Sequence, residues 1–107
     1  MRSLLNSFLF EVILDIGKVI KSVRMGKNMR QKELSESCNI SVTYLSQIEN
    51  NKKDPTISTL QEISKYLGIP LPIIFFMSLE DQDIPPQKKE FFKYLYPSLN
   101  GLIKEFF

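Results

Sequence analysis

The chain has few of the side chains that enzymes use for catalysis. It contains no histidine and a single cysteine, Cys38. Neither a Ser/His/Asp triad nor a Cys/His pair can therefore be assembled, the usual zinc ligand sets are missing, and no internal disulfide can form. A lone cysteine of this kind is more often a small buried hydrophobe than a redox sensor. We predict a protein without enzymatic activity, cofactor or metal ion.

A different chemistry is concentrated between Ser41 and Asn50. At about 100° per residue in a helix, Leu45 and Ile48 fall on one face and polar or β-branched side chains on the other. The polar face carries no charge between Ser41 and Ile48, whereas surface helices usually carry Glu and Lys there. Such a face is slim enough to enter a DNA major groove, about 12 Å wide, and to bond base edges. Its residues are Val42, Thr43, Ser46, Gln47 and Asn50.

Gln47 is the residue on this face best suited to recognising a base. A glutamine amide can bond both N6 and N7 of adenine, and Val42 or Thr43 can contact a thymine methyl group. An ordinary solvated surface is the alternative for the same face, and the missing charges favour base recognition.

The elements that must position these residues are helices. Apolar residues recur at helical spacing, strand-like alternation is absent, and Gly and Pro fall between the periodic segments, so the sequence predicts an all-α fold. Ser41 and Thr56 are expected N-caps, and Asn28, Asn39 and Gly68 stand where helix ends favour left-handed backbone. The expected core helices cover about 16–28, 30–38, 41–50, 56–67 and 71–77.

The chain divides into three parts. Residues 1–15 form an apolar N-terminal arm or helix extension, with Leu4, Leu5, Phe8, Leu9, Val12 and Ile13 at helical spacing. Residues 16–77 form the compact domain and hold nine Lys or Arg against five Asp or Glu, whereas each flank has one more acidic than basic residue. This distribution fits a nucleic-acid footprint.

Residues 78–107 combine a linker with a C-terminal helix. The linker holds Glu80, Asp81 and Asp83, a cluster more typical of a solvated segment than of a cation site. In the amphipathic helix that follows, Pro97 and Gly101 are expected to cause a kink or a split. No segment reaches the roughly 18 apolar residues of a membrane span, and no signal-peptide cleavage site is visible, so we expect a cytoplasmic protein.

A dense set of residues between 16 and 77 resembles one known family. The set comprises Ile16-Gly17, Arg24, Gln31, Leu34, Ser35, Ser41, Tyr44-Leu45-Ser46, Ile48-Glu49-Asn50, Lys52, Pro55, Thr59-Leu60 and Leu67-Gly68. It is similar to the XRE family of phage-repressor and Cro-like helix-turn-helix proteins. The departures are Ser35 for the usual Ala, Cys38 for an apolar residue, and Asn39 and Asn51 for Gly. The resemblance implies a five-helix domain, similar to that of lambda repressor, whose second and third helices bind double-stranded DNA, commonly in a homodimer.

The resemblance also assigns roles to single residues. It implies that Gln31 contacts the DNA backbone, in agreement with its place in the first turn of a helix. It implies that Arg24 and Glu49 form a structural ion pair orienting the recognition helix. Lys52 and Lys53 follow that helix and would lie near phosphates. The expected DNA-contacting residues are Gln31, Ser41, Val42, Thr43, Tyr44, Ser46, Gln47, Asn50, Lys52 and Lys53.

Apolar surface beyond the needs of the core predicts self-association. The fifth helix and both arms carry more apolar residues than a domain of about 60 residues can bury, and a two-fold homodimer would cover them. Arms folded back on their own domain are the alternative. The expected dimer interface comprises Ile73, Ile74, Phe75, Phe76, Phe91, Phe92 and Leu95.

The sequence as a whole favours a sequence-specific transcriptional regulator, a repressor or an autoregulator acting on a two-fold operator. Restriction-modification controllers and antitoxin-type regulators fit the same residues. So does an interaction module whose C-terminal helix binds a partner protein, such as an antagonist or a toxin.

Overall fold

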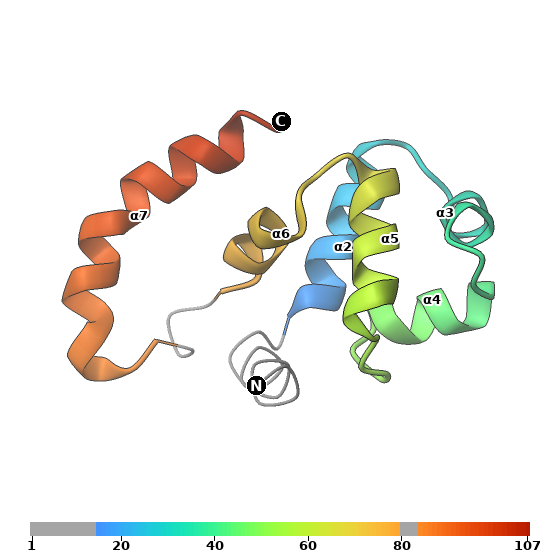
Figure 1. Cartoon of the computed structure of the whole chain (residues 1–107), viewed down its shortest axis with the longest axis horizontal. Coiled ribbons are helices and arrows are strands. Elements are labelled where there is room, and N and C mark those ends of the chain that lie inside the picture. Colours follow the sequence, from blue (N-terminus) through green and yellow to red (C-terminus); the bar gives the residue numbers. More distant parts are fainter. Residues whose placement is uncertain (1–14, 80–83) are drawn as a thin grey trace.

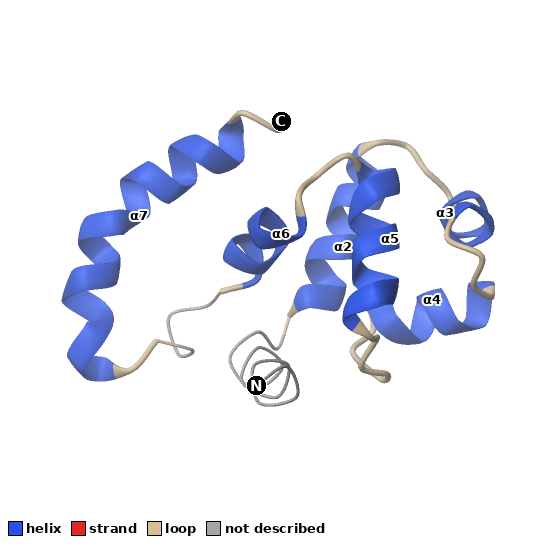
Figure 2. Ribbon diagram, in the orientation of Figure 1, coloured by secondary structure: helices blue, strands red, loops and turns tan. Residues whose placement is uncertain are grey.

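The computed structural model describes residues 15–79 and 84–107. Within these ranges the chain forms helices and loops and no β-strand (Figure 2), which confirms the all-α prediction. The predicted N-terminal arm, apart from its last residue Asp15, lies outside the described residues. The acidic cluster of the linker, Glu80, Asp81 and Asp83, lies outside them as well. Figure 1 shows the elements α2 (Ile16–Gly26), α3 (Gln31–Ser37), α4 (Val42–Glu49), α5 (Ile57–Leu67), α6 (Leu71–Ser78), the 3-10 helix η2 (Pro86–Lys88) and α7 (Lys89–Lys104).

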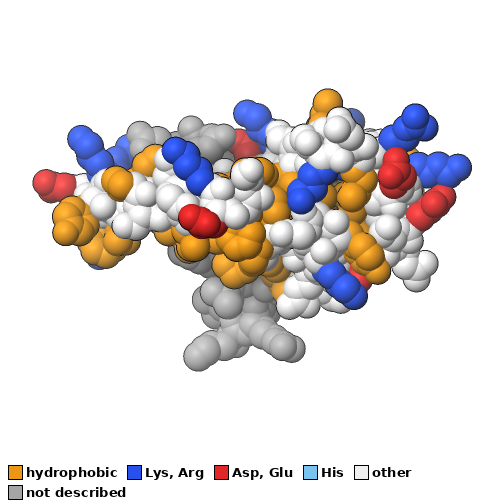
Figure 3. Space-filling model, turned by 90° about the horizontal axis from the view of Figure 1, so that it is seen from above, with side chains coloured by type: hydrophobic (Ala, Val, Ile, Leu, Met, Phe, Trp, Pro, Cys, Tyr) orange, Lys and Arg blue, Asp and Glu red, His pale blue; other side chains and the backbone are white. Residues whose placement is uncertain are grey.

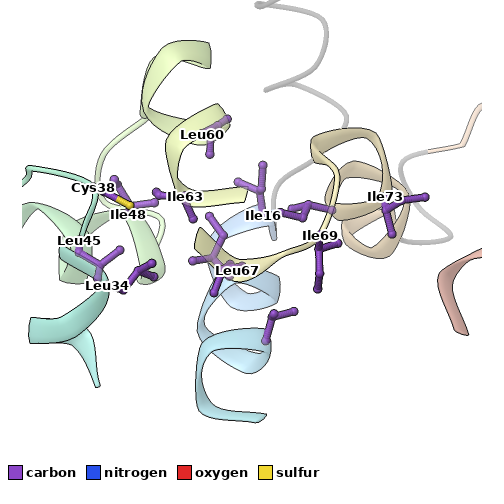
Figure 4. Close-up of a cluster of buried hydrophobic side chains, with 13 residues drawn as sticks. Ile16, Leu34, Cys38, Leu45, Ile48, Leu60, Ile63, Leu67, Ile69 and Ile73 are labelled. Carbon is purple, nitrogen blue, oxygen red and sulfur yellow. The ribbon is translucent and has the colours of Figure 1, made fainter. Parts of the chain in front are cut away.

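The hydrophobic core is built by α2 to α6. Helix α2 packs against α4 and α6, α3 packs against α4 and α5, and α5 packs against α6. Leu34, Leu45, Ile63 and Leu67 are fully buried, and Figure 4 shows side chains from these helices converging on one cluster. The core therefore fixes α3 and α4 through their apolar sides.

Three helices end on an asparagine with left-handed backbone. Asn28, Asn39 and Asn51 have φ of 55°, 58° and 56°, and Gly68 ends α5 with φ of 72°. Asparagine tolerates this region better than other residues with a Cβ. At the end of α4 the N–H of Lys52 donates to the Gln47 carbonyl at 2.8 Å, closing a Schellman motif. The left-handed geometry expected at 28, 39 and 68 is confirmed.

Two helices begin with the predicted side-chain caps. The N–H of Tyr44 donates to the Ser41 hydroxyl oxygen at 3.0 Å, and the N–H of Thr59 donates to the Thr56 hydroxyl oxygen at 3.1 Å. Each bond satisfies a backbone donor that has no partner within its helix.

Helix α6 lies between α2 and α7 and contacts both (Figure 1). For this reason Ile73 and Ile74 are only 5% and 1% exposed, whereas Phe75 is half-buried and Phe76 is 38% exposed. Ile73 and Ile74, expected in the dimer interface, are part of the core of their own chain, so the free apolar surface of α6 comes from other residues such as Phe76.

Helix α7 is continuous through Pro97 and curved (Figure 1), so the segment bends and does not split. A proline removes one N–H donor, and the bonds on either side can maintain the helix with a bend. Ile103 packs against the core cluster, but no residue of α7 is itself buried. No helix among the described residues is long and apolar enough to cross a membrane.

Candidate nucleic-acid interface

Helices α3 and α4 form a helix-turn-helix unit at one end of the molecule, on the right in Figure 1. The turn between them is short and runs through Asn39, whose left-handed backbone reverses the chain. The N–H of Ile40 donates to the Ser35 carbonyl at 3.0 Å. The turn is therefore tied to α3, and α4 begins directly after it.

Helix α4 has one buried and one free face. Leu45 and Ile48 are 0% and 1% exposed, whereas Val42 and Thr43 are exposed and Gln47 is half-buried. The free face carries no charged side chain. It presents hydrogen-bonding and methyl groups without the long charged side chains of an ordinary surface helix.

The polar residues at the end of α4 differ in how free they are. The Asn50 Nδ2 donates to the Ser46 carbonyl at 2.9 Å, so this amide is partly used within its own helix. Its carbonyl oxygen remains available to a partner. Of the other expected DNA-contacting residues, Ser41 is exposed, and Tyr44 and Ser46 are half-buried.

A buried ion pair supports α4 from behind. The Arg24 Nε donates to Glu49 Oε2 at 2.7 Å and its Nη2 donates to Oε1 at 3.1 Å. The Arg24 Nη1 donates to the Met29 carbonyl at 2.8 Å. Both side chains are nearly inaccessible to solvent, so the expected pair is present and joins α2, the loop after it and α4.

Gln31 belongs to the same network. Its Nε2 donates to Glu49 Oε1 at 2.9 Å, which leaves one N–H of the amide unused by this bond. The network thus fixes the first residue of α3 relative to the last residue of α4. Lys52 and Lys53 lie exposed in the loop that follows α4.

The sequence alone did not predict a second hydrogen-bonded contact between α2 and the end of α4, here called a joint like the Arg24–Glu49 pair. It involves Asn51, in the turn directly after α4. The N–H of Gly17 donates to Asn51 Oδ1 at 3.2 Å. A Cβ at residue 17 would overlap the carbonyl oxygen of Ile48. A glycine inside a helix is the signal that could have revealed this close approach, because it costs helix stability unless something packs there.

Cys38 is the C-cap residue of α3 and is buried, with 7% exposure. Burial, reinforced by the carboxylate of Glu62, raises the pKa of the Cys38 thiol to about 11. The sulfur is therefore neutral near pH 7 and serves as a small core side chain.

These features define the chain as a helix-turn-helix protein in which the outer face of α4 is uncharged and basic residues follow in the next loop. A helix-turn-helix family model matches residues 20–74, and the chain belongs to the XRE family of helix-turn-helix regulators. Among its relatives, an immunity repressor protein of Bacillus phage phi105 is 30% identical over 95 residues, which cover 78% of this chain and 66% of the relative.

Two solved structures resemble the fold. The clp gene regulator ClgR from Corynebacterium glutamicum superimposes with a TM-score of 0.63 at 21% identity, covering 81% of this chain and 93% of that one. A mutant of the restriction-modification controller protein C.Esp1396I gives a TM-score of 0.56 at 33% identity, covering 68% and 96%. The chain spans about two thirds of the length of the phage repressor and about half that of the ClgR regulators of Mycobacterium tuberculosis.

Proposed function

We propose that this protein binds a specific double-stranded DNA sequence and regulates transcription by occupying it. The observation that carries the proposal is the charge-free outer face of α4, supported on its inner side by Leu45, Ile48 and the buried Glu49. A rigid helix of this kind can enter the major groove and bond base edges. The family membership supports the same function.

Base recognition is assigned to the outer residues of α4. The Gln47 amide discriminates adenine, and Val42 and Thr43 contact thymine methyl groups. Ser46 and the free carbonyl oxygen of Asn50 add contacts one turn further along the helix.

Phosphate contacts come from the edges of the unit. Lys52 and Lys53 extend from the loop after α4 and supply affinity without sequence information. The free N–H of Gln31, the Ser41 hydroxyl and the Tyr44 hydroxyl are additional donors. Together these residues orient α4 on the duplex.

A homodimer on a two-fold operator fits the remaining surface. The aromatic and aliphatic side chains of α7 are largely exposed (Figure 3), with Phe91, Leu95 and Leu102 at 63%, 38% and 47%. On α6, Phe76 is 38% exposed and Phe75 is half-buried, and on α7 Phe92 is half-buried. Isologous pairing would cover these side chains and place two recognition helices about 34 Å apart. Binding of an antagonist or toxin to α7 is the alternative use of the same surface.

The test begins with selection of duplexes from a random-sequence library by the full chain. Gln47→Ala is then compared with Lys53→Ala on the selected duplex and on a scrambled one. We expect Gln47→Ala to weaken binding to the selected duplex by about 1 to 3 kcal/mol and to reduce discrimination. Lys53→Ala should weaken both duplexes by similar factors. If no duplex is enriched by the selection, the proposed function is wrong.

A further inference from the structure

The first turn of α2 is capped by a residue from a distant part of the chain. Asp15 occupies the N-cap position, but its side chain makes no capping hydrogen bond. The N–H of Gly17 donates instead to Asn51 Oδ1 at 3.2 Å, 34 positions further along the chain. Because the first N–H groups of a helix have no partner within it, this bond satisfies one of them. It also ties the start of α2 to the end of α4.

Next to this bond the backbone of α2 at Gly17 is in direct contact with the backbone of the last turn of α4. A Cβ on Gly17 would overlap the Ile48 carbonyl oxygen and would come within 2.8 Å of the Glu49 carbonyl oxygen. The last turn of α4 therefore rests directly on the backbone of α2. Glycine is required at this position by the space available, not by its own backbone angles.

The two joints between α2 and the end of α4 are attached at different positions along the axis of α2. Arg24 binds Glu49 near the end of α2, and Gly17 binds Asn51 near its start. At 1.5 Å per residue, these positions on α2 are about 10 Å apart along the helix axis. Core packing of Leu45 and Ile48 already restrains α4. Two bonds at this separation on α2 add a restraint on the tilt of the end of α4 that one bond alone would not give.

Asparagine meets two demands at position 51. The backbone requires a left-handed residue there, with φ of 56°, and the N–H of Asn51 donates to the Ile48 carbonyl at 3.1 Å. Glycine would satisfy this conformation but would offer no side-chain oxygen to Gly17. Asparagine and aspartate supply both, since each tolerates the left-handed region and carries an acceptor.

We propose that Asn51 is a positioning residue that sets the orientation of the recognition helix by capping α2. This inference rests on the proposed function. Base contacts require placement within about 0.5 Å, whereas flexible lysines still reach phosphates after a small tilt of α4. Loss of the cap should therefore lower the discrimination between duplexes more than the affinity for DNA in general.

Three variants of the full chain test the proposal. Asn51→Gly keeps the left-handed backbone and removes the acceptor, and Asn51→Asp keeps both. Asn28→Gly is the matched control, because Asn28 is also exposed, follows the end of a helix and has φ of 55°. The readouts are the ratio of Kd values for the scrambled and selected duplexes at one salt concentration, and the exchange rate of the Gly17 amide proton measured by NMR.

We expect Asn51→Gly to lower the Kd ratio about fivefold, the equivalent of about 1 kcal/mol, and to speed exchange at Gly17. Asn28→Gly should change neither. Asn51→Asp should preserve the ratio and the Gly17 protection, while its added negative charge weakens both duplexes alike through repulsion from phosphates.

Each contrary result has a distinct meaning. An unchanged Kd ratio in Asn51→Gly, with faster Gly17 exchange, would reduce the bond to a structural cap and overturn the positioning role. Equal Gly17 exchange in the wild type and Asn51→Gly would overturn the joint itself. If the wild-type chain binds all duplexes equally well, the proposed function is wrong, and so is the role of Asn51 in recognition. The exchange rate of the Gly17 amide would still decide whether the bond to Asn51 exists.

Discussion

At the scale of single residues, the buried polar network is the feature that most distinguishes this chain from an ordinary helical bundle. The Glu49 carboxylate accepts bonds from Arg24 and from Gln31. Such a charge is tolerated inside a protein only when its partners are complete. The network therefore contributes specificity of orientation, and its stability is sensitive to the loss of one member.

Removal of Glu49 should be strongly destabilising. In Glu49→Ala the Arg24 guanidinium would stay buried with a single remaining partner, the Met29 carbonyl. We expect a loss of about 3 to 5 kcal/mol in the free energy of unfolding, measured by urea denaturation. The exposed Glu36→Ala serves as the control and should change stability by less than about 0.5 kcal/mol. A double variant, Arg24→Met with Glu49→Leu, should recover much of the loss because no unpaired charge remains. Equal stabilities of Glu49→Ala and Glu36→Ala would contradict this account.

The Cys38 thiol predicts a specific pH dependence. Its pKa rises from the ordinary 9.0 to about 11 in the folded chain, so between these values the folded state binds more protons than the unfolded state. The corresponding stability is fully present below pH 9 and is lost as the pH rises through 11, by about 3 kcal/mol in all. Urea titrations of the wild type and Cys38→Ala at pH 7, 9 and 10.5 isolate the contribution of Cys38 to the free energy of unfolding. Tyrosines and lysines titrate in both proteins, so their contribution cancels in the comparison. Parallel pH profiles for the two proteins would show that Cys38 does not contribute.

At the scale of elements, α4 depends on its N-cap more than a longer helix would. It has eight residues, and isolated helices of this length are unstable in water. Its order comes from Leu45 and Ile48 in the core, from the Ser41 cap and from the joints to α2. Each support acts on a different side or end of the helix.

The cap is testable by substitution. Ser41→Ala removes the oxygen that accepts from the Tyr44 N–H, and we expect it to cost about 1 kcal/mol in the free energy of unfolding. Ser37→Ala, at the exposed end of α3, is the matched control and should be neutral or slightly stabilising because alanine favours helices. Chemical denaturation monitored by circular dichroism gives both values. If the two variants have the same midpoint, the capping bond contributes nothing.

At the scale of the whole molecule, the proposed DNA-binding surface and the proposed association surface are separate. The helix-turn-helix unit lies at one end and α7 at the other (Figure 1). Exposed basic residues, including Arg30, Lys52 and Lys53, accompany the first region, and exposed aromatic residues accompany the second. This separation allows α7 to associate with another chain without covering α4.

The association is expected to give a dimer. Light scattering after size exclusion should report the mass of two chains at micromolar concentration. Phe91→Glu places a charge on the exposed apolar surface of α7 and should shift the mass toward one chain, with weaker operator binding. Ser98→Glu, at an exposed position on the same helix, adds the same single negative charge and is the control for a change of charge alone. A wild-type mass of one chain would mean that α7 stays with its own domain.

The affinity for DNA should depend steeply on salt. Each phosphate neutralised by a lysine or arginine releases counterions, so log K falls linearly with log salt concentration, with a slope of about −0.9 per contact. Lys52→Ala should reduce the magnitude of the slope by about one on any duplex. Fluorescence anisotropy between 50 and 200 mM salt measures it, and an affinity independent of salt would contradict the proposed phosphate contacts.

The sequence by itself determined the local features of the structure. The 3.6-residue period of the apolar side chains predicted the helices, and the hydroxyl groups of Ser41 and Thr56 predicted their caps. Asn28 and Asn39 marked two helix ends, since their tolerance of left-handed backbone depends only on neighbouring residues. The division of α4 into core and free faces follows from the same local geometry.

Only the tertiary structure decided which surfaces meet. Ile73 and Ile74 have the same apolar character as Phe76, and α6 is apolar nearly all round, so its sequence has no period that shows which face its own chain covers. The bond from Gly17 to Asn51 joins residues 34 positions apart, and its partners are fixed by how α2 and α4 pack. A local pattern cannot specify such a contact, because it depends on the positions of two helices that are set by the whole core.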